Sequence, residues 1–195
     1  MENLWAPWRM AYIAPKNAAR PGCIFCIQPA EQRDEEHHIL YRGEHCFMML
    51  NLYPYNNGHL MVAPYKHVGA LEQLDAAILA DLMAQAQLAL KALRLAMNPD
   101  GFNMGFNQGK VAGAGYAEHI HFHIVPRWNG DTNFMPVIGE VKVMPEHLDT
   151  VYHTLLNALE QVKGKKLDLP AKHITDTAHS LNQFGVRRIF LQLLA

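Results

Sequence analysis

The sequence predicts an α+β domain in which an antiparallel sheet of about five strands packs with one long helix and a C-terminal helix. Short apolar segments bounded by glycine, proline and asparagine are typical of strands. Two longer stretches repeat apolar residues every three or four positions, which indicates helices with one buried face. Half of the 195 residues are hydrophobic, which suffices for one core, and strands with helices between and after them give this layered architecture.

Each element has its own signal. The expected strands cover 38–42, 46–51, 59–63, 102–107 and 118–127. The first two form a hairpin, because a glycine turn separates them. The long helix is expected to begin after the N-cap Asp75 and to end at Met97, before Asn98-Pro99-Asp100-Gly101. The second helix is expected over 146–162. The chain therefore divides into an N-terminal arm (1–20), one domain (21–163) and a C-terminal tail (164–195).

Composition limits the function classes. Lysine and arginine number 17 against 18 aspartates and glutamates, for a formal charge of −1. A long nucleic-acid backbone needs many cationic contacts, so a nucleic-acid partner is not expected. The sequence has no run of 18 apolar residues and no secretory signal pattern, so we expect neither a membrane span nor secretion. Three cysteines, two of them in Cys23-x-x-Cys26, suit a reducing compartment, and we expect a cytoplasmic protein.

Histidine is unusually abundant and unusually placed. The chain has 12 histidines, and three of them alternate with apolar residues in His119-Ile120-His121-Phe122-His123. Random placement would give about 0.04 such triples in a chain of this length and composition. Since side chains alternate between the faces of a strand, the histidines share one face and the apolar residues the other. Histidines facing a pocket offer a nucleophile or metal ligands near neutral pH.

A glycine-rich loop precedes the histidines and favours a phosphate ligand. It runs over 107–115, and glycine lets backbone N–H groups approach an anion closely. A phosphate next to three histidines is the natural inference. The alternative is a flexible connection between two strands.

The segment His119 to Val125 resembles the signature of the histidine triad (HIT) superfamily, in which histidine and apolar residues alternate and two apolar residues follow. The similarity covers about 20–130 and extends to Asn51, 54–62, the glycine loop and 126–128. Within the superfamily the chain is most similar to the branch of bacterial diadenosine tetraphosphate phosphorylases, through 4–10, 51–55, Ala117-Glu118 and 128–134.

The resemblance implies roles for individual residues. His121 would be the nucleophile that attacks the α-phosphorus and carries a nucleotidyl group as a phosphoramidate. The main-chain carbonyl of His119 would accept a hydrogen bond from the ring of His121. His123 would contact phosphate and leaving-group oxygens. His59 would lie behind the triad as a supporting residue or as an ordinary buried histidine. The expected substrate-binding residues are Asn51 at the ribose and, at the phosphates, Asn107, Gly109, Gly113 and Gly115 with the other loop amides.

The implied reaction is phosphorolysis of diadenosine tetraphosphate to ATP and ADP, with inorganic phosphate as co-substrate, in a homodimer. One departure bears on it. Family members commonly carry a glutamine or a hydroxyl residue shortly before the first histidine, where this chain has Ala114 and Gly115. Water could then replace phosphate, so hydrolysis of a dinucleoside polyphosphate or of a nucleoside phosphoramidate stays an alternative.

A structural zinc site is also implied. Cys23 and Cys26 have zinc-ligand spacing, but two ligands do not close a tetrahedral site. In zinc-carrying relatives two histidines complete it, and the matching positions here are His67 and His119. Cys46 lies in an apolar segment and is expected in the core.

Two further classes remain open at this point. In a metal hydrolase, His119, His121 and His123 would all bind a catalytic metal that activates water, although neither an acidic ligand nor a purpose for the glycine loop is then apparent. In a binding or scaffolding protein, nucleotide would bind without turnover.

Overall fold

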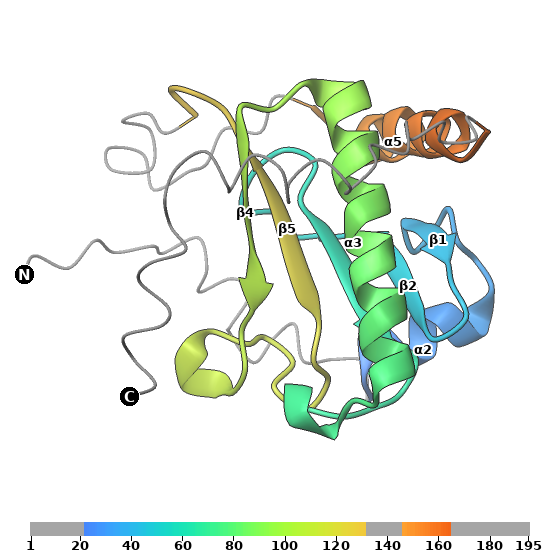
Figure 1. The fold of residues 1–195 in the computed structure, drawn as a ribbon, viewed down its shortest axis with the longest axis vertical. Helices are drawn as coiled ribbons and strands as arrows, with labels where there is room; N and C mark the ends of the chain where they lie inside the picture. The colour runs from blue at the N-terminus through green and yellow to red at the C-terminus, as the bar shows by residue number, and fades with distance from the viewer. Residues whose placement is uncertain (1–21, 132–145, 165–195) are drawn as a thin grey trace, which may run out of the picture. The chain divides into compact units, whose positions relative to one another are not determined.

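The computed structural model describes residues 22–131 and 146–164, so the predicted arm and tail lie outside the described residues. Within them, five antiparallel strands form one sheet in the order β1-β2-β3-β5-β4 (Figure 1). The strands are β1 (Ile39–Arg42), β2 (Cys46–Leu50), β3 (Leu60–Pro64), β4 (Gly101–Phe106) and β5 (Phe122–Arg127). The predicted α+β class and the strand number are confirmed.

Helix α3 (Ala76–Met97) crosses one face of this sheet (Figure 1). The Asp75 carboxylate accepts the Ile78 backbone N–H at 3.0 Å, and Asn98 ends the helix in the left-handed conformation. Both predicted ends are therefore confirmed. Among the described residues, α3 is long and apolar enough to cross a membrane, judged by length and composition only. Its buried residues, Leu82 and Leu93 among them, belong to the cluster that contacts the sheet, as in a core helix.

Helix α5 (Leu148–Gly164) packs against α3 and β1. It starts and ends two residues later than predicted. The apolar repeat predicts an inner face of six residues, of which Val151, Tyr152, Leu155 and Leu159 are buried. The other two, Leu148 and Val162, are half-buried, and Ala158 is buried in addition. The Tyr152 hydroxyl donates to the Ile39 carbonyl at 3.3 Å, which joins the helix to the edge of the sheet.

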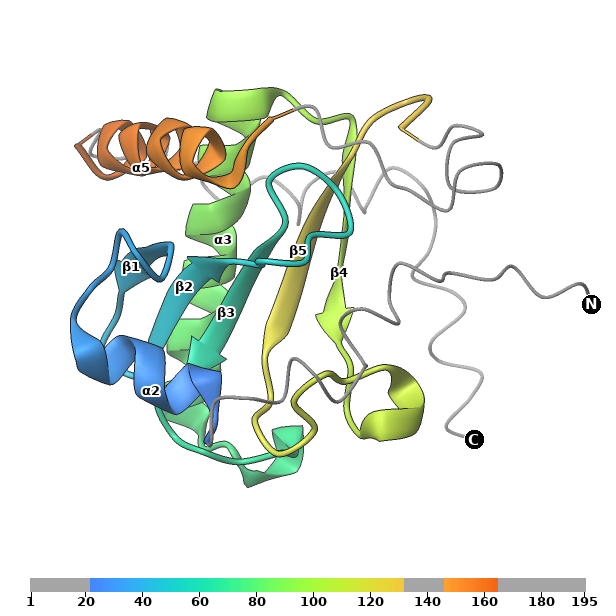
Figure 2. The same ribbon diagram turned by 180° about the vertical axis from the view of Figure 1, so that it is seen from behind.

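Helix α2 (Ile24–Glu31) lies on the opposite face of the sheet, beside β1 and β2 (Figure 2). The sequence did not predict it. Phe25 on this helix belongs to a second apolar cluster, whose other buried members are Ile39, Phe47, Met49, Met61 and Ala63. The sheet is thus covered on both faces, by different helices.

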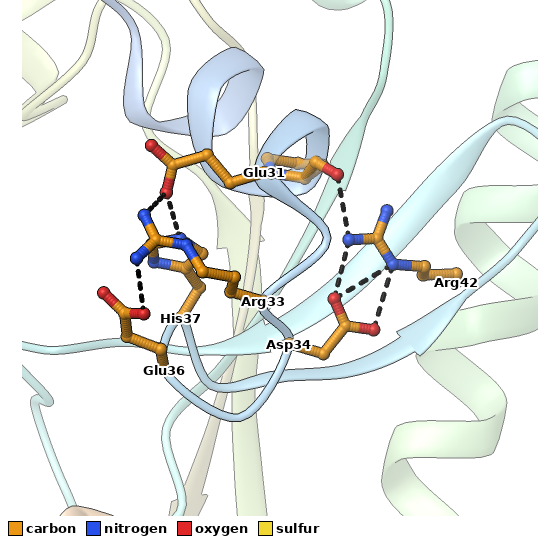
Figure 3. A network of polar contacts seen from close by, with 7 residues as sticks. Glu31, Arg33, Asp34, Glu36, His37 and Arg42 are labelled. Atoms are coloured by element: carbon orange, nitrogen blue, oxygen red, sulfur yellow. Dashed lines mark hydrogen bonds and ion pairs between the residues drawn. The ribbon is translucent and has the colours of Figure 1, made fainter.

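A polar network fastens the C-terminal end of α2 (Figure 3). The Arg42 guanidinium donates to both oxygens of Asp34, and at 2.9 Å to the carbonyl of Pro29 in the helix. Glu31 accepts from Arg33 and, at 2.5 Å, pairs with the buried His37. These contacts hold the helix on β1, and the same helix reaches the histidines at its other end.

One predicted strand is wrong in part. Residues 118–121 do not belong to the regular ladder, since β5 begins at Phe122. The His119 N–H donates to the Tyr116 carbonyl at 3.3 Å as in a turn, whereas the Ile120 N–H donates to the Val68 carbonyl at 2.7 Å. The predicted alternation nevertheless holds. Ile120, Phe122 and Ile124 join the α3-side core, while His119 and His121 contact Phe25 on the other side.

Candidate active site and metal centre

The middle histidine has a defined tautomer. The Nδ1 of His121 lies 2.8 Å from the main-chain carbonyl oxygen of His119. A carbonyl can only accept, so Nδ1 carries the proton and donates it, and Nε2 is left with its lone pair. His121 is 6% exposed. Burial disfavours the imidazolium and lowers the pKa of His121 below its ordinary value, partly opposed by the bond to His119. The ring is therefore uncharged, and its Nε2 lone pair has the form that a nucleophilic attack requires.

An aromatic ring holds this imidazole from one side. Phe25 stacks on His121 with ring centroids 4.6 Å apart and planes inclined by 27°. It also contacts His119 at 5.2 Å and meets Tyr116 edge-on at 5.8 Å. No sequence pattern predicts this role, because Phe25 is a single aromatic residue within the Cys23-x-x-Cys26 segment. Only the path of α2 brings it to the histidines.

His59 and His123 form a hydrogen-bonded relay next to His121, whose ring centroid lies 4.7 Å from that of His123. The Tyr55 backbone N–H donates to His59 Nδ1 at 3.0 Å, so the proton of neutral His59 is on Nε2. This N–H donates to Nδ1 of His123, also at 3.0 Å. A neutral His123 then carries its own proton on Nε2. His59 is fully buried, a position that fits a supporting residue and an ordinary buried histidine equally well.

Asn51 lies at the end of β2 next to this relay. Its side-chain nitrogen is 3.3 Å from His59 Nδ1, and its side-chain oxygen accepts the Tyr53 N–H at 2.9 Å. The side chain is thus oriented by its own loop beside His59. Its predicted contact with a ribose stays a prediction.

Asn107 directly follows β4. The last residue of β4, Phe106, pairs with Phe122, which is the residue after His121. Asn107 thus leaves the sheet at the end where β5 begins, and its predicted contact with a phosphate stays a prediction. The side chain of Gln108 anchors the loop that follows, since its oxygen accepts the Leu71 N–H at 3.0 Å. Gln108 was not predicted, because an exposed glutamine carries no signal by itself.

The glycine loop is more ordered than predicted. A 3₁₀ turn spans Lys110–Ala112 between Gly109 and Gly113, which both have positive φ angles (86° and 89°). Three of its backbone amides already donate within the loop, those of Ala112, Gly113 and Ala114. In this conformation these amides do not serve a phosphate, which leaves Gly109 and Gly115 as the predicted glycines whose amides this turn does not use.

The four residues predicted as metal ligands converge. One donor atom from each of Cys23, Cys26, His67 and His119 lies within 4.8 Å of all the others. His119 Nδ1 is 3.3 Å from Cys23 Sγ, 3.6 Å from Cys26 Sγ and 3.2 Å from His67 Nδ1. Tetrahedral zinc with bonds of about 2.0–2.1 Å to nitrogen and about 2.3 Å to sulfur sets neighbouring donors roughly 3.3–3.8 Å apart. The cluster fits such an ion.

Protonation in this cluster also suits a cation. His119 Nε2 donates to the Pro64 carbonyl at 2.9 Å, so Nδ1 is the nitrogen with a lone pair among the thiols. Burial lowers the pKa of His119 to about 4, and burial followed by the nearby Cys26 raises the pKa of the Cys23 thiol to about 11. A neutral imidazole is the ligand form, and a bound cation holds thiols as thiolates. The third cysteine, Cys46, is fully buried in the core as predicted.

A close backbone approach brings these ligands together. A Cβ built on Gly69 would lie 2.6 Å from the Ala117 carbonyl oxygen. Two residues before Gly69 stands His67, and two residues after Ala117 stands His119. The two segments touch because position 69 has no side chain.

The three triad histidines do not share one metal. His119 turns to the cysteines, His121 donates to a carbonyl and His123 accepts from His59. Within 22–131 and 146–164, the cluster with Cys23 and Cys26 is the one group of histidines, cysteines or carboxylates with ligand spacing. The catalytic-metal alternative is therefore not supported.

These features define a class of protein in which a buried histidine with a fixed tautomer follows a histidine that belongs to a group of possible metal ligands. The model of the HIT domain matches residues 32–130, and the chain belongs to the HIT domain family. It is 44% identical over 155 residues to a Mycobacterium tuberculosis protein named AP-4-A phosphorylase, covering 76% of this chain and 79% of that one.

Two further relatives support the family and the fold. An uncharacterised HIT-like protein of Methanocaldococcus jannaschii is 32% identical over 142 residues, 73% of this chain and 99% of that protein. A zinc-bound histidine triad family protein from Mycobacterium smegmatis superposes with a TM-score of 0.61 at 27% identity, covering 73% of this chain and 96% of that one.

Proposed function

We propose that the chain cleaves nucleoside polyphosphates through a covalent nucleotidyl-His121 intermediate, and that its substrate is diadenosine tetraphosphate. One observation carries the mechanism: the 2.8 Å bond from His121 Nδ1 to the His119 carbonyl, which leaves Nε2 as the nucleophile. The similarity to a protein named AP-4-A phosphorylase supports the substrate.

In the first step, Nε2 of His121 attacks the α-phosphorus of one adenosine. A nitrogen–phosphorus bond forms, the bond from phosphorus to the bridging oxygen breaks, and ATP leaves with the electron pair. The Nε2 proton of His123 is available to the leaving oxygen, because His59 fixes the other ring nitrogen as an acceptor. Asn107, which directly follows β4, donates to a non-bridging oxygen that gains charge in the transition state.

In the second step, inorganic phosphate attacks the adenylyl-histidine, the nitrogen–phosphorus bond breaks, and ADP leaves. Water in the same position would give AMP instead. Hydrolysis of a dinucleoside polyphosphate or of a nucleoside phosphoramidate is the second candidate, and one observation favours it: Ala114 and Gly115 offer no side-chain donor for a phosphate, and the Ala114 amide donates to Gly109.

A product assay separates these functions. Purified chain is incubated with diadenosine tetraphosphate, with and without inorganic phosphate, and ATP, ADP and AMP are quantified. ATP with ADP, formed only when phosphate is present, supports phosphorolysis. ATP with AMP, formed irrespective of phosphate, makes the chain a hydrolase. An acid-labile, base-stable adenylyl adduct that maps to His121 supports the intermediate, and the absence of turnover on any of these substrates refutes the proposal.

We also propose that Cys23, Cys26, His67 and His119 hold a structural zinc ion. The donor separations and the chemistry of two thiols with two imidazoles support this ion over harder cations. Bound there, zinc would tie α2 and the segment before α3 to the backbone that carries His121. All four protein ligands are used, so no position stays open for substrate. Metal analysis of the purified chain tests the assignment.

A cytoplasmic homodimer completes the proposal. The reduced cysteines that a thiolate site needs agree with a cytoplasmic protein. Strand β4 is an edge of the described sheet, and Met104 on it is 51% exposed, which offers a surface for a second copy. Light scattering across a concentration series would give the mass in solution, and a monomer at all concentrations would contradict the dimer.

A further inference from the structure

The most informative group outside the reaction scheme is the side chain of Gln28. It is 6% exposed, and its side-chain oxygen is buried with no hydrogen-bond partner among the described residues. Buried polar atoms are nearly always paired, because water is lost without replacement when they are not. An unpaired amide oxygen in a covered position is therefore a candidate contact for a ligand where the groups around it also point to one.

Gln28 lies on the face of α2 that meets the sheet beside the nucleophile. The buried residues of α2 are Phe25, Gln28 and Pro29. Positions three apart share a helix face, and Phe25 is the ring that stacks on His121. Gln28 thus continues, one turn along the helix, the surface that begins at the nucleophile. His121 and His123 are 6% and 8% exposed, which is close to the 6% of Gln28. Gln28 is therefore as accessible to a ligand as the two histidines are.

The strands under this part of α2 are apolar. Met61 pairs with His123 across β3 and β5, and Met49 pairs with Met61 across β2 and β3. Both methionines belong to the cluster that contains Phe25. The row of side chains therefore passes from the catalytic His123 over two methionines, which are flexible and polarisable neighbours for a flat ring. The Gln28 amide is the polar group that α2 buries on this apolar side.

We propose that the side-chain amide of Gln28 binds the edge of the substrate's base and selects adenine over guanine. The inference rests on the proposed function, because a nucleotidyl group on His121 has to extend its nucleoside along the surface next to that ring. An amide carries a donor and an acceptor side by side, which matches the amino group and ring nitrogen of adenine. The same edge of guanine presents two acceptors, so the Gln28 oxygen would oppose one of them.

The test compares Gln28→Met with the parent chain. Methionine keeps the length and removes both polar atoms. The ratio of kcat/KM for diadenosine tetraphosphate to kcat/KM for diguanosine tetraphosphate should fall about tenfold or more in the variant. The melting temperature should stay equal or rise, because an unpaired buried oxygen is removed. An unchanged ratio overturns the proposal, whatever the melting temperature does.

Gln85 provides a matched control. It is 2% exposed and also has an unpaired side-chain oxygen, but it lies on α3, where its nitrogen donates to the Cys46 carbonyl at 2.8 Å. Gln85→Met should lower the melting temperature and leave the base ratio unchanged. A shift of the ratio in both variants would assign the effect to general loosening and reject the role of Gln28.

Binding measurements keep the inference separate from the reaction. AMP and GMP are titrated calorimetrically into the parent chain, Gln28→Met and Gln28→Glu. Glutamate retains an acceptor and loses the donor, so it should keep part of the preference for AMP that methionine loses. If the parent binds AMP in preference to GMP but cleaves no dinucleotide, the proposed function fails and the base contact stands. If the parent cleaves both dinucleotides equally well, the function stands and the base contact fails.

Discussion

His119 and His121 are two histidines only two positions apart, and both are buried on one side of the chain. They nevertheless keep their protons on opposite ring nitrogens. His119 donates from Nε2 to the Pro64 carbonyl and turns Nδ1 to the thiols. His121 donates from Nδ1 to the His119 carbonyl and keeps the Nε2 lone pair. The acceptor that each ring meets, and not the residue type, decides that one side chain suits a metal and the other suits a phosphorus atom.

The largest expected effect comes from replacing His121. His121→Ala removes the nucleophile, and turnover should fall by about 10⁴-fold or more, as for other covalent catalysts. The zinc content and the circular dichroism spectrum should be those of the parent, because His119 is untouched. Steady-state assays with diadenosine tetraphosphate measure the loss. His45→Ala is the control, since His45 contacts Glu44 outside the site, and retained turnover in His121→Ala would contradict the mechanism.

The next effect concerns the donor group of His119 and is tested by replacing His67. His67→Ala leaves three donors, so zinc content should drop from one equivalent to a small fraction, and the free energy of unfolding should fall by about 4 kcal/mol. The rate of the folded enzyme should change less than tenfold at low temperature. Metal analysis and urea unfolding check both numbers. Lys66→Ala, one residue earlier, should change neither, and full zinc retention in His67→Ala would remove His67 from the ligand set.

The relay behind His121 gives a smaller and sharper test. His59→Phe removes the N–H that donates to His123 at 3.0 Å, and kcat should fall about 10- to 100-fold while zinc content stays constant. His59→Gln can donate in the same direction and should recover part of the rate. If the phenylalanine and glutamine variants lose the same amount, His59 acts by packing alone.

The smallest expected effect concerns the helix that touches both histidines. The hydrogen bond from Arg33, followed by that from His37, holds the pKa of Glu31 below its usual range. A lowered carboxylate pKa stabilises the fold above the unfolded pKa of about 4.3, and this contribution is lost as the pH falls through the folded value. Glu31→Gln should therefore lower the melting temperature by about 2 °C at pH 7, and this difference should shrink as the pH falls below the unfolded pKa. Melting curves across pH check this, and a constant difference at all pH values would contradict it.

Sequence reasoning succeeded where periodicity is long or chemistry is specific. The long helix was predicted to within a residue because its apolar repeat and its N-cap at Asp75 agree. The four-donor cluster was predicted through the family resemblance, since Cys23 and Cys26 are 41 or more positions away from His67 and His119 and no local pattern links them.

Other features were beyond the sequence. Helix α2 has eight residues and contains Pro29, which is an element too short for a clear repeat and carries a residue that normally ends helices. The start of β5 was misplaced because alternation continues through His119 and His121 although the ladder begins at Phe122. The hydrogen bonds inside the glycine loop depend on two positive φ angles, and composition does not reveal which amides they use.

The contact at Gly69 has a consequence for how variation at this protein should be interpreted. A single methyl group at position 69 would lie 2.6 Å from the Ala117 carbonyl oxygen. It would push apart two stretches of main chain, each of which places one imidazole next to Cys23 and Cys26. A mutational scan should therefore find this inert position as intolerant as the reactive ones. The loss of function there would be steric in origin, with every reacting group still present in the sequence.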